Sequence, residues 1–569
     1  MVLVAACALA VPTRCRPGSG GPADLVLVRG NVATLDPGRP RAQAIAVRGE
    51  RIVAVGTDED VAPLVGPSTR VIDLAGRLAV PGLVEGHAHF LSLGRSKRIL
   101  ELGGESSWDD VVAKVAAAAR SAAPGAWIEG RGWHQERWSA PAEPSVEGFP
   151  TRAALDRAAP ANPVWLRHAS GHASIANGAA LERSGLARSR GNPPGGRIVR
   201  DARGAPTGAL VEAADDPVRR AIESERAALA PEEREAELRR DALRAQEECL
   251  SKGIVAFHDA GASFETIALL RKMALDGSLR LRLHVMIEEP DEEIAARAHE
   301  LPIVGAAGGR LTVRAIKRYM DGALGSRGAW MLRPYADDPG TAGMSVEPIE
   351  KLEATARLAI EQGLQLCVHA IGDRANREVL DLYERVFRSR PDKKDPRWRI
   401  EHAQHVDPLD AGRFGRLGVI AAMQGIHCAS DAPWVVARVG ERRAREGAYA
   451  WRSLIASGAT IVNGTDAPVE AVDPIACFAA SVTRRARGGS LFFPEQRMTR
   501  EEALRSYTAN AAWAAFEEKD RGTLAPGKLA DVTVLSEDIL SVPDDRIPGA
   551  RAVLTLVGGA VEYDALGAR

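Results

Sequence analysis

The sequence has few cysteines and no excess of either charge. Its six cysteines show no CxxC spacing, which argues against a cysteine-bound zinc site and against a disulfide framework. The 74 basic and 75 acidic residues leave a net charge of −1, so no nucleic-acid partner and no anionic membrane is predicted. No repeat of solenoid period occurs. What is present is a chain of 569 residues with ordinary hydrophobic and charged fractions (45% and 26%), long enough to bury a large core.

Residues 1–23 are predicted to be a leader or tether. The apolar stretch that opens the chain is too short to span a bilayer. Val4-Ala5-Ala6-Cys7 resembles a bacterial lipoprotein cleavage site, which would place a lipid anchor on Cys7, but the usual positively charged segment before it is missing. If residues 1–15 are a truncated signal, we expect an envelope lipoprotein or a secreted protein. The alternative is a disordered tail on a cytoplasmic protein.

Both ends of the chain predict short β-strands. Residues 24–80 contain apolar or alternating runs separated by Gly, Asn and Asp, and residues 521–563 have the same pattern. Chain termini often lie close together, and a domain can be inserted between them. We therefore expect one small β-sandwich domain built from both ends.

Between these ends, residues 81–520 predict an α/β fold, a (β/α)8 TIM barrel. Strand-like runs alternate with helical segments such as 349–363, which ends at a glycine. Eight parallel strands with intervening helices are typical of this barrel. One predicted strand ends at His89, and the other seven lie within residues 253–261, 279–287, 310–322, 364–373, 397–406, 418–424 and 459–469.

The segment 91–252 is too long to be a loop, since such loops usually have about 2–6 residues. It contains its own predicted helices and a hairpin. An insert after the first barrel strand emerges at the face where barrel active sites lie, so we expect it to cover the active-site mouth. Its tryptophans are interpreted either as a substrate pocket or, preferably, as the core of the insert: Trp108, Trp127, Trp133, Trp138 and Trp165.

The strand ending in PGLVEGHAHF carries two histidines one residue apart. In an extended strand, residues i and i+2 point to the same face, so His87 and His89 can reach one metal ion. The alternative is a pair of buried histidines that are hydrogen-bonded in a core. The turn Pro81-Gly82 and the paired spacing favour the metal site.

Lys317 shares a face of its strand with Val313 and Ala315 by the period of two. A free ammonium inside a packed barrel is costly to bury. Carboxylation by CO2 would convert it into a carbamate anion that can bridge two cations. The alternatives are a lysine paired with Asp321 or Glu401, or one turned outward.

Three further candidates end strand-like segments. His369 and His402 have the strand-end context that a barrel ligand needs, while His405 falls in the following loop and is predicted to contact the substrate. Asp466 ends its segment before Ala467-Pro468. A carboxylate there can bind metal and shuttle the proton of a water molecule, although an Asx-turn is the alternative.

Five motifs resemble the amidohydrolase superfamily, in the amidohydrolase family 3 branch that includes N-substituted formamide deformylases. The likeness runs in the family's order from about Ala23 to Tyr563, and also covers GRGWHQERW and SGHASIANGAAL in the insert. The motifs are PGLVEGHAHF, IKRYMDGALGSRGA, VHAIGDRA, RIEHAQHV and NGTDAPV.

The resemblance implies a divalent metal centre of one or two ions. His87 and His89 would bind the first metal, carboxylated Lys317 would bridge, His369 and His402 would bind the second, and Asp466 would hold the catalytic water. The residues that the resemblance assigns to substrate binding are Trp133, His172, Asp321, Asp373 and Arg374.

The predicted function is metal-dependent hydrolysis of a non-peptide C–N bond, in an amide, an N-substituted formamide or a related small molecule. Imidazole and carboxylate ligands suit zinc, with iron or manganese as alternatives. A homodimer is the commonest assembly for such an enzyme. The rival functions are a metal-dependent deaminase of an aminated ring, against which Lys317 argues, and a non-catalytic metal-binding barrel.

Overall fold

The computed structural model describes residues 21–135, 138–168, 173–193 and 196–567. The predicted lipid anchor at Cys7 lies outside these residues. The chain divides into two compact units, one made of residues 91–245 and the other of the segments on either side. Every helix in the described ranges is too short or too polar to cross a membrane.

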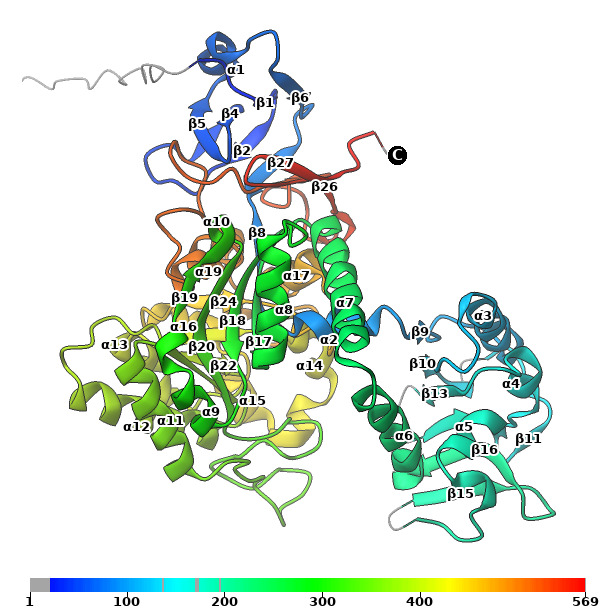
Figure 1. The fold of residues 1–569 in the computed structure, drawn as a ribbon. Coiled ribbons are helices and arrows are strands. Elements are labelled where there is room, and N and C mark those ends of the chain that lie inside the picture. The colour runs from blue at the N-terminus through cyan, green and yellow to red at the C-terminus, as the bar shows by residue number, and fades with distance from the viewer. Residues whose placement is uncertain (1–20, 136–137, 169–172, 194–195, 568–569) are drawn as a thin grey trace, which may run out of the picture. The chain divides into compact units, whose positions relative to one another are not determined.

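The larger unit contains a parallel barrel of eight strands, as the sequence predicts (Figure 1). Seven pairs of neighbouring barrel strands are hydrogen-bonded in parallel register. A short ninth strand, β19 (Ile303–Gly305), adds antiparallel to one of them. The barrel strands in chain order are β8 (Leu83–Ala88), β17 (Ile254–Ala262), β18 (Arg282–Ile287), β20 (Leu311–Tyr319), β21 (Gln365–Ala370), β22 (Arg399–His402), β23 (Ile420–Met423) and β24 (Ile461–Asn463).

The helices of this unit follow the strands in sequence. The predicted helix at 349–363 is confirmed as α11, and it ends at Gly363 in the left-handed conformation that glycine adopts readily. The principal helices are α8 (Phe264–Leu275), α9 (Asp291–Ala296), α11 (Ile349–Gln362), α12 (Asp373–Ser389), α13 (Pro408–Leu417), α14 (Gly425–Val439), α15 (Glu441–Gly447), α16 (Trp451–Ala456), α17 (Pro474–Thr483), α18 (Arg500–Ser506) and α19 (Ala509–Ala514).

The barrel closes where its first strand, β8, meets the end of its last strand, β24. The carboxylate of Glu85 accepts hydrogen bonds from the backbone N–H and the hydroxyl of Thr465, at 2.7 and 2.9 Å. The N–H of Asp466 donates to the carbonyl of His87 at 2.8 Å. A Cβ atom on Gly464 would lie 2.4 Å from Glu85 Oε1, so the close approach requires glycine there.

The interior of the barrel contains both apolar and polar buried side chains. A fully buried cluster takes one residue from each of four neighbouring strands: Ala260, Met286, Ala315 and Cys367. This placement confirms the interpretation of Cys367 as a core residue. Active sites of such barrels lie at the carboxyl ends of the strands.

Two further sheets in the same unit come from the ends of the chain. One has the order β5-β4-β1-β6, and the other has the order β27-β26-β25-β7-β2-β3, which mixes C-terminal with N-terminal strands. The two sheets share one hydrophobic core cluster. Their strands are β1 (Leu25–Val28), β2 (Asn31–Ala33), β3 (Arg41–Ala42), β4 (Ala44–Arg48), β5 (Arg51–Gly56), β6 (Arg70–Asp73), β7 (Leu78–Pro81), β25 (Val532–Leu535), β26 (Ala552–Val557) and β27 (Ala560–Asp564).

A buried ion pair joins the barrel to the C-terminal strands. Arg282 begins β18, and its Nε lies 2.9 Å from a carboxylate oxygen of Asp531, directly before β25. Both side chains are almost fully buried. Burial by itself would raise the pKa of Asp531, but the charge of Arg282 outweighs it and lowers that pKa below its usual value. The aspartate is therefore a buried anion with a fixed partner.

The 91–245 unit has a six-stranded sheet of order β15-β16-β14-β13-β10-β9. The predicted hairpin is confirmed, since β15 and β16 pair antiparallel. The five tryptophans pack in or against its two hydrophobic clusters, which favours the interpretation as core. Its elements are β9 (Leu100–Glu101), α3 (Trp108–Ser121), β10 (Ile128–Trp133), α4 (Ala153–Ala158), β13 (Val164–His168), β14 (Ala173–Ala176), α5 (Gly178–Arg183), β15 (Gly196–Arg200), β16 (Pro206–Glu212), α6 (Asp216–Ala227) and the first part of α7 (Pro231–Ser251). That this insert covers the barrel mouth stays a prediction.

Candidate metal centre

The two histidines that end β8 converge on one carboxylate oxygen. Asp466 Oδ1 lies 3.6 Å from His87 Nε2 and 3.3 Å from His89 Nε2. The three side chains form a group whose ligand atoms all lie within 4.8 Å of one another. They come from opposite ends of the barrel sequence, and the closure between β8 and β24 brings them together. The structure thus assembles the first part of the predicted ligand set.

His87 is held from behind by a buried charged network. Its Nδ1 contacts the carboxylate of Glu401, on β22, and that carboxylate also accepts from Arg399 Nε at 2.7 Å. Burial favours a raised pKa for Glu401, but Arg399 and His87 outweigh it and lower the pKa to about 2. A carboxylate bound to one ring nitrogen fixes the tautomer and leaves the other, Nε2, free for a metal.

The next two predicted ligands end adjacent strands. His369 lies on β21 and His402 on β22, with ring centroids 4.4 Å apart. The ring of His402 is also 4.9 Å from that of His87. Burial lowers the pKa of His369 to about 3 and lowers that of His402 well below its usual value. The imidazoles are therefore neutral at pH 7, which is the form that binds metal.

Asp321 lies directly beneath His369 and is nearly fully buried. Its Oδ1 is 3.6 Å from His369 Nε2, and its two oxygens accept three backbone N–H groups, from Trp330, Ile371 and Gly372, at 2.8–2.9 Å. The carboxylate is thus used to hold the loops after β20 and β21 in place. Its predicted contact with substrate stays a prediction, and its observed contacts are those of a positioning residue.

His402 is oriented by an amide and faces a further histidine. Its Nδ1 lies 2.8 Å from the side-chain oxygen of Gln424, which follows β23. The ring of His427, in the first turn of α14, is nearly parallel to that of His402, with an interplanar angle of 8° and centroids 6.1 Å apart. His402, His427 and Asp466 form a second group with ligand atoms within 4.8 Å of one another.

Two residues of the centre have unusual backbone conformations. His402 has φ 73° and Asp466 has φ 58°, both in the left-handed region that residues other than glycine rarely adopt. Such conformations persist where the surrounding structure fixes them, and they cluster at functional sites. His402 is the last residue of β22, whereas Asp466 lies three residues after the end of β24.

Lys317 lies on β20 and is almost fully buried. Its Nζ is 4.5 Å from the centroid of the Tyr319 ring, and no carboxylate of the described residues forms an ion pair with it. Burial lowers the pKa of Lys317, while Glu401, Asp466 and Glu288 act in the opposite direction. Pairing with Asp321 or Glu401, the alternative drawn from the sequence, is not observed.

The donor atoms fit a divalent metal. His87 Nε2, His369 Nε2 and Asp466 Oδ1 are buried and have no hydrogen-bond partner within the described part of the chain. Buried polar atoms are normally paired, so orphaned atoms that converge need an explanation. His87 Nε2 and Asp466 Oδ1 lie 3.6 Å apart at the mouth of the barrel, and a metal ion would satisfy both atoms. His369 belongs to neither of the two converging groups found among the described residues.

The remaining predicted substrate contacts fall in different places. Trp133 is fully buried in the core of the 91–245 unit and donates its indole N–H to the carbonyl of Leu166 at 3.0 Å. His172 lies outside the described residues. Arg374 is exposed, with its guanidinium 4.8 Å from the Trp330 ring. The contacts of all three with substrate stay predictions.

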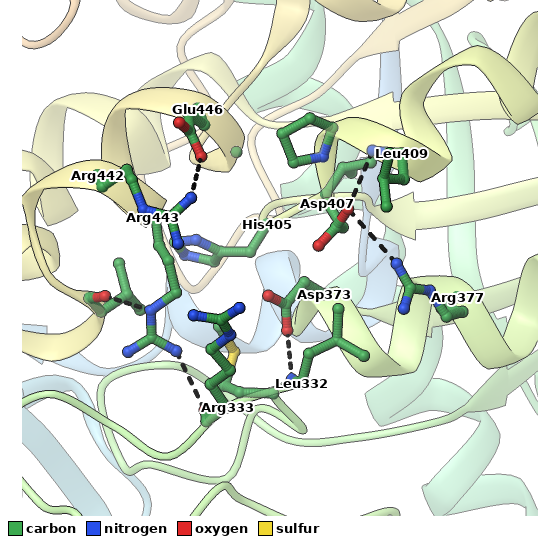
Figure 2. A pocket seen from close by; sticks show the side chains of 15 residues that line it. Leu332, Arg333, Asp373, Arg377, His405, Asp407, Leu409, Arg442, Arg443 and Glu446 are labelled. Atoms are coloured by element: carbon green, nitrogen blue, oxygen red, sulfur yellow. Dashed lines mark hydrogen bonds and ion pairs between the residues drawn. The ribbon is translucent and has the colours of Figure 1, made fainter.

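Asp373 and His405 line one cavity next to the metal centre's strands (Figure 2). Asp373 begins α12 and accepts the backbone N–H of Leu332 at 2.7 Å. His405 follows β22 by three residues, as predicted; it is buried, and its Nε2 has no hydrogen-bond partner among the described residues. None of the residues lining this cavity belongs to the metal-ligand candidates.

Sequence patterns did not single out three residues of the centre. The sequence suggests Glu401 only as a partner for Lys317, and it predicts no role for Gln424 or His427. Glu401 could have been found from the period of two along β22, because Arg399 and Glu401 lie on the same, inward face of that strand. That face places a buried carboxylate beside the proposed metal ligands. For His427 the signal was its position four residues after the end of β23, at the barrel mouth.

Comparison with known proteins decides the family. The amidohydrolase family matches residues 70–563, and the site described above lies within that range. The chain belongs to the amidohydrolase family. This amidohydrolase is 33% identical to Protein LONG AFTER FAR-RED 3 of Arabidopsis thaliana, over 96% of this chain and 93% of the relative.

Two other proteins are similar along their whole lengths. The amidohydrolase is 27% identical to the N-substituted formamide deformylase of Arthrobacter pascens, covering 96% of this chain and 99% of that one. Among solved structures, an uncharacterized metal-dependent hydrolase from Pyrococcus horikoshii OT3 is 26% identical, with a TM-score of 0.73, covering 92% of this chain and 99% of that chain. The predicted superfamily is confirmed.

Proposed function

We propose that this amidohydrolase hydrolyses a non-peptide C–N bond in a small amide, such as an N-substituted formamide. The observation that carries the proposal is the position of Asp466, whose Oδ1 lies within 3.6 Å of both histidine nitrogens at the end of β8. A carboxylate so placed can bind both a metal and the proton of a water molecule. The similarity to an N-substituted formamide deformylase over nearly the full length supports this substrate class.

The centre would hold one or two divalent ions, with zinc as the expected metal because imidazole and carboxylate donors suit it. His87, His89 and Asp466 would hold one ion, and His369 and His402 would complete the set. Carboxylated Lys317 would be the bridging ligand. The burial of its amine without an ion-pair partner among the described residues supports this, since a carbamate removes the buried positive charge.

The chemistry that a metal supplies when bound is the activation of water near neutral pH and the polarisation of a carbonyl group. Asp466 accepts a proton from the attacking water and passes it to the amide nitrogen as the C–N bond breaks. The hydroxyl of the water ends on the carbonyl carbon and its proton on the amine, which gives a carboxylic acid (formic acid for a formamide) and a free amine. His427 Nε2, which is buried and has no hydrogen-bond partner among the described residues, donates to the carbonyl oxygen.

The test is an activity screen with metal-free and zinc-loaded protein. The panel contains N-substituted formamides, simple amides and aminated heteroaromatic rings, with release of amine or ammonia as the readout. We expect zinc-dependent turnover of formamides or amides. Asp466→Asn should lower kcat by about 100- to 10,000-fold, the usual contribution of a positioned acid or base.

A matched control is Asp544→Asn, which removes an exposed carboxylate that pairs with Arg500 outside the centre. It should leave kcat unchanged. Equal turnover with and without metal would contradict the proposal. Release of ammonia from aminated rings alone would replace amide hydrolysis with deamination.

A further inference from the structure

The cavity lined by Asp373 and His405 lies at the carboxyl end of the barrel. It is bounded by loops that follow the strands carrying the proposed metal ligands. It has a volume of about 720 Å³ and lies among the segments after β20, β21 and β22 and the helices α14 and α15. Figure 2 shows its side chains, in which arginines predominate. The four arginines are Arg333, Arg377, Arg442 and Arg443.

Two of the arginines are neutralised inside the cavity wall. Arg377 lies 2.8 Å from Asp410 and 3.4 Å from Asp407, and Arg442 donates to Glu446 at 3.2 Å. These pairs use two of the three carboxylates that line the cavity. The cations that remain without a carboxylate partner among the described residues are Arg333 and Arg443.

The guanidinium of Arg443 is fixed in position by the backbone. It donates to the carbonyl groups of Val439, Arg333 and Pro334, the last at 2.8 Å. These bonds use three of its five N–H donors. Burial lowers the pKa of Arg443. The negative charge of Asp373 acts in the opposite direction, and the positive charge of Arg333 lowers the pKa further. The fixed guanidinium thus keeps two N–H donors, and no carboxylate of the described residues forms an ion pair with it.

The rest of the lining indicates what kind of anion fits. His405 is buried, and Figure 2 shows its ring in the middle of the lining side chains. Burial and the charge of Arg443 lower the pKa of His405 to about 3, so the ring is neutral at pH 7. Leu409 stands at the rim with 83% of its surface exposed, and Met331 also lines the cavity. The cavity therefore combines a cationic end with apolar walls.

We propose that this cavity binds a small molecule that carries one carboxylate on an apolar body, with Arg333 and Arg443 as the carboxylate-binding pair. Planar guanidinium groups match carboxylates in geometry. Two of the four arginines already have carboxylate partners, and Asp373 lines the same cavity, so a monoanion is favoured over a phosphate dianion. The site lies outside the metal-ligand set, and the inference does not depend on the proposed hydrolysis.

The experiment uses ligand-observed fluorine NMR on the full-length protein, with 4-fluorobenzoate as the probe and neutral 4-fluorobenzamide as its isostere. We expect saturable broadening of the benzoate signal and at least fivefold weaker binding of the benzamide. Arg333→Gln, at an exposed position, should weaken benzoate binding about tenfold through the loss of a charge-assisted hydrogen bond. Arg443→Lys should weaken benzoate binding as well, because a lysine ammonium cannot reproduce the planar pair of N–H donors that a guanidinium offers to a carboxylate.

Two controls separate this cavity from the metal centre. Arg445→Gln removes a neighbouring cation on α15 that pairs with Glu441 and Glu495 and does not line the cavity, and it should not change binding. Removal of metal with a chelator should also leave benzoate binding intact.

Each alternative outcome overturns the proposal in a recognisable way. Benzoate binding that disappears with the metal and survives Arg333→Gln belongs to the metal centre. Equal binding of benzoate and benzamide would mean an apolar site without carboxylate recognition. If inorganic phosphate displaces 4-fluorobenzoate at a lower concentration than unlabelled benzoate does, the cavity recognises a phosphate and not a carboxylate.

Discussion

Replacement of Glu401 by glutamine should weaken metal binding without touching a metal ligand. The carboxylate holds His87 by its Nδ1 and is itself held by Arg399 Nε and a terminal nitrogen of the same guanidinium, at 2.7 and 2.9 Å. A glutamine keeps the shape but loses the charge, and its amide can present an N–H to the histidine instead of an acceptor. The preferred tautomer of His87 is then lost.

Two magnitudes follow from these contacts. Loss of the partner of a metal-binding histidine typically lowers metal affinity or activity about 10- to 100-fold. The substitution also leaves Arg399 buried without a counter-charge, since both side chains are fully buried, and removal of one partner from a buried ion pair costs about 3–5 kcal/mol. Glu401→Gln should therefore lose both affinity and stability.

The assay is a zinc titration against a chromogenic chelator, together with urea unfolding of the metal-free protein. The matched control is Asp531→Asn, which breaks the equally buried pair with Arg282 away from the centre. It should lose about 3–5 kcal/mol of stability while keeping its zinc affinity. Unchanged zinc affinity in Glu401→Gln would refute the role of the carboxylate in positioning His87.

Three further outcomes are expected. His427→Ala should lower kcat about 100-fold or more while KM and zinc content change little, because removal of an oxyanion donor typically lowers kcat by this factor. The Nε2 of His427 has no hydrogen-bond partner among the described residues and lies near Asp466. A loss of zinc instead would make His427 a metal ligand. Gly464→Ala should lower the melting temperature and the zinc content together, because its Cβ would lie 2.4 Å from Glu85 Oε1. An unchanged melting temperature would contradict the close packing of β8 against the end of β24. Acid should destabilise the protein as the pH falls below about 6.5. Burial lowers the pKa of His284 from 6.5 to about 3, so the unfolded chain binds a proton at this group before the folded protein does. The stability lost through His284 amounts to about 1.4 kcal/mol per pH unit. His284→Leu should flatten the slope of unfolding free energy against pH measured in urea, and an identical slope would show that His284 does not contribute.

The parts of the fold that follow from local periodicity were predictable. A strand-end histidine is visible as the last residue of an apolar run, which is why His87, His369 and His402 could be named before their distances were known. The period of two placed Lys317 and Ala315 on one face, and the structure buries both. The helix at 349–363 was marked by its terminal glycine.

The residues that were not predicted act across strands. Glu401 reaches His87 over 314 positions of sequence, and Gln424 orients His402 from the neighbouring strand. Such contacts depend on which strands are adjacent and on their stagger, and no pattern within one segment reports that. His427 lies in a helix whose sequence resembles an ordinary amphipathic segment, so only the three-dimensional structure shows its ring parallel to His402.

The closure at Glu85 and Thr465 has a consequence for biosynthesis. These residues are 380 positions apart, and the ligands His87 and Asp466 lie on the two sides of that same seam. A nascent chain cannot complete the donor set until almost the entire barrel has left the ribosome, because contacts this distant in sequence form late. Loading of the proposed metal would therefore report on finished folding, and a chain truncated before residue 466 should be unable to retain the ion however stable its remaining elements are.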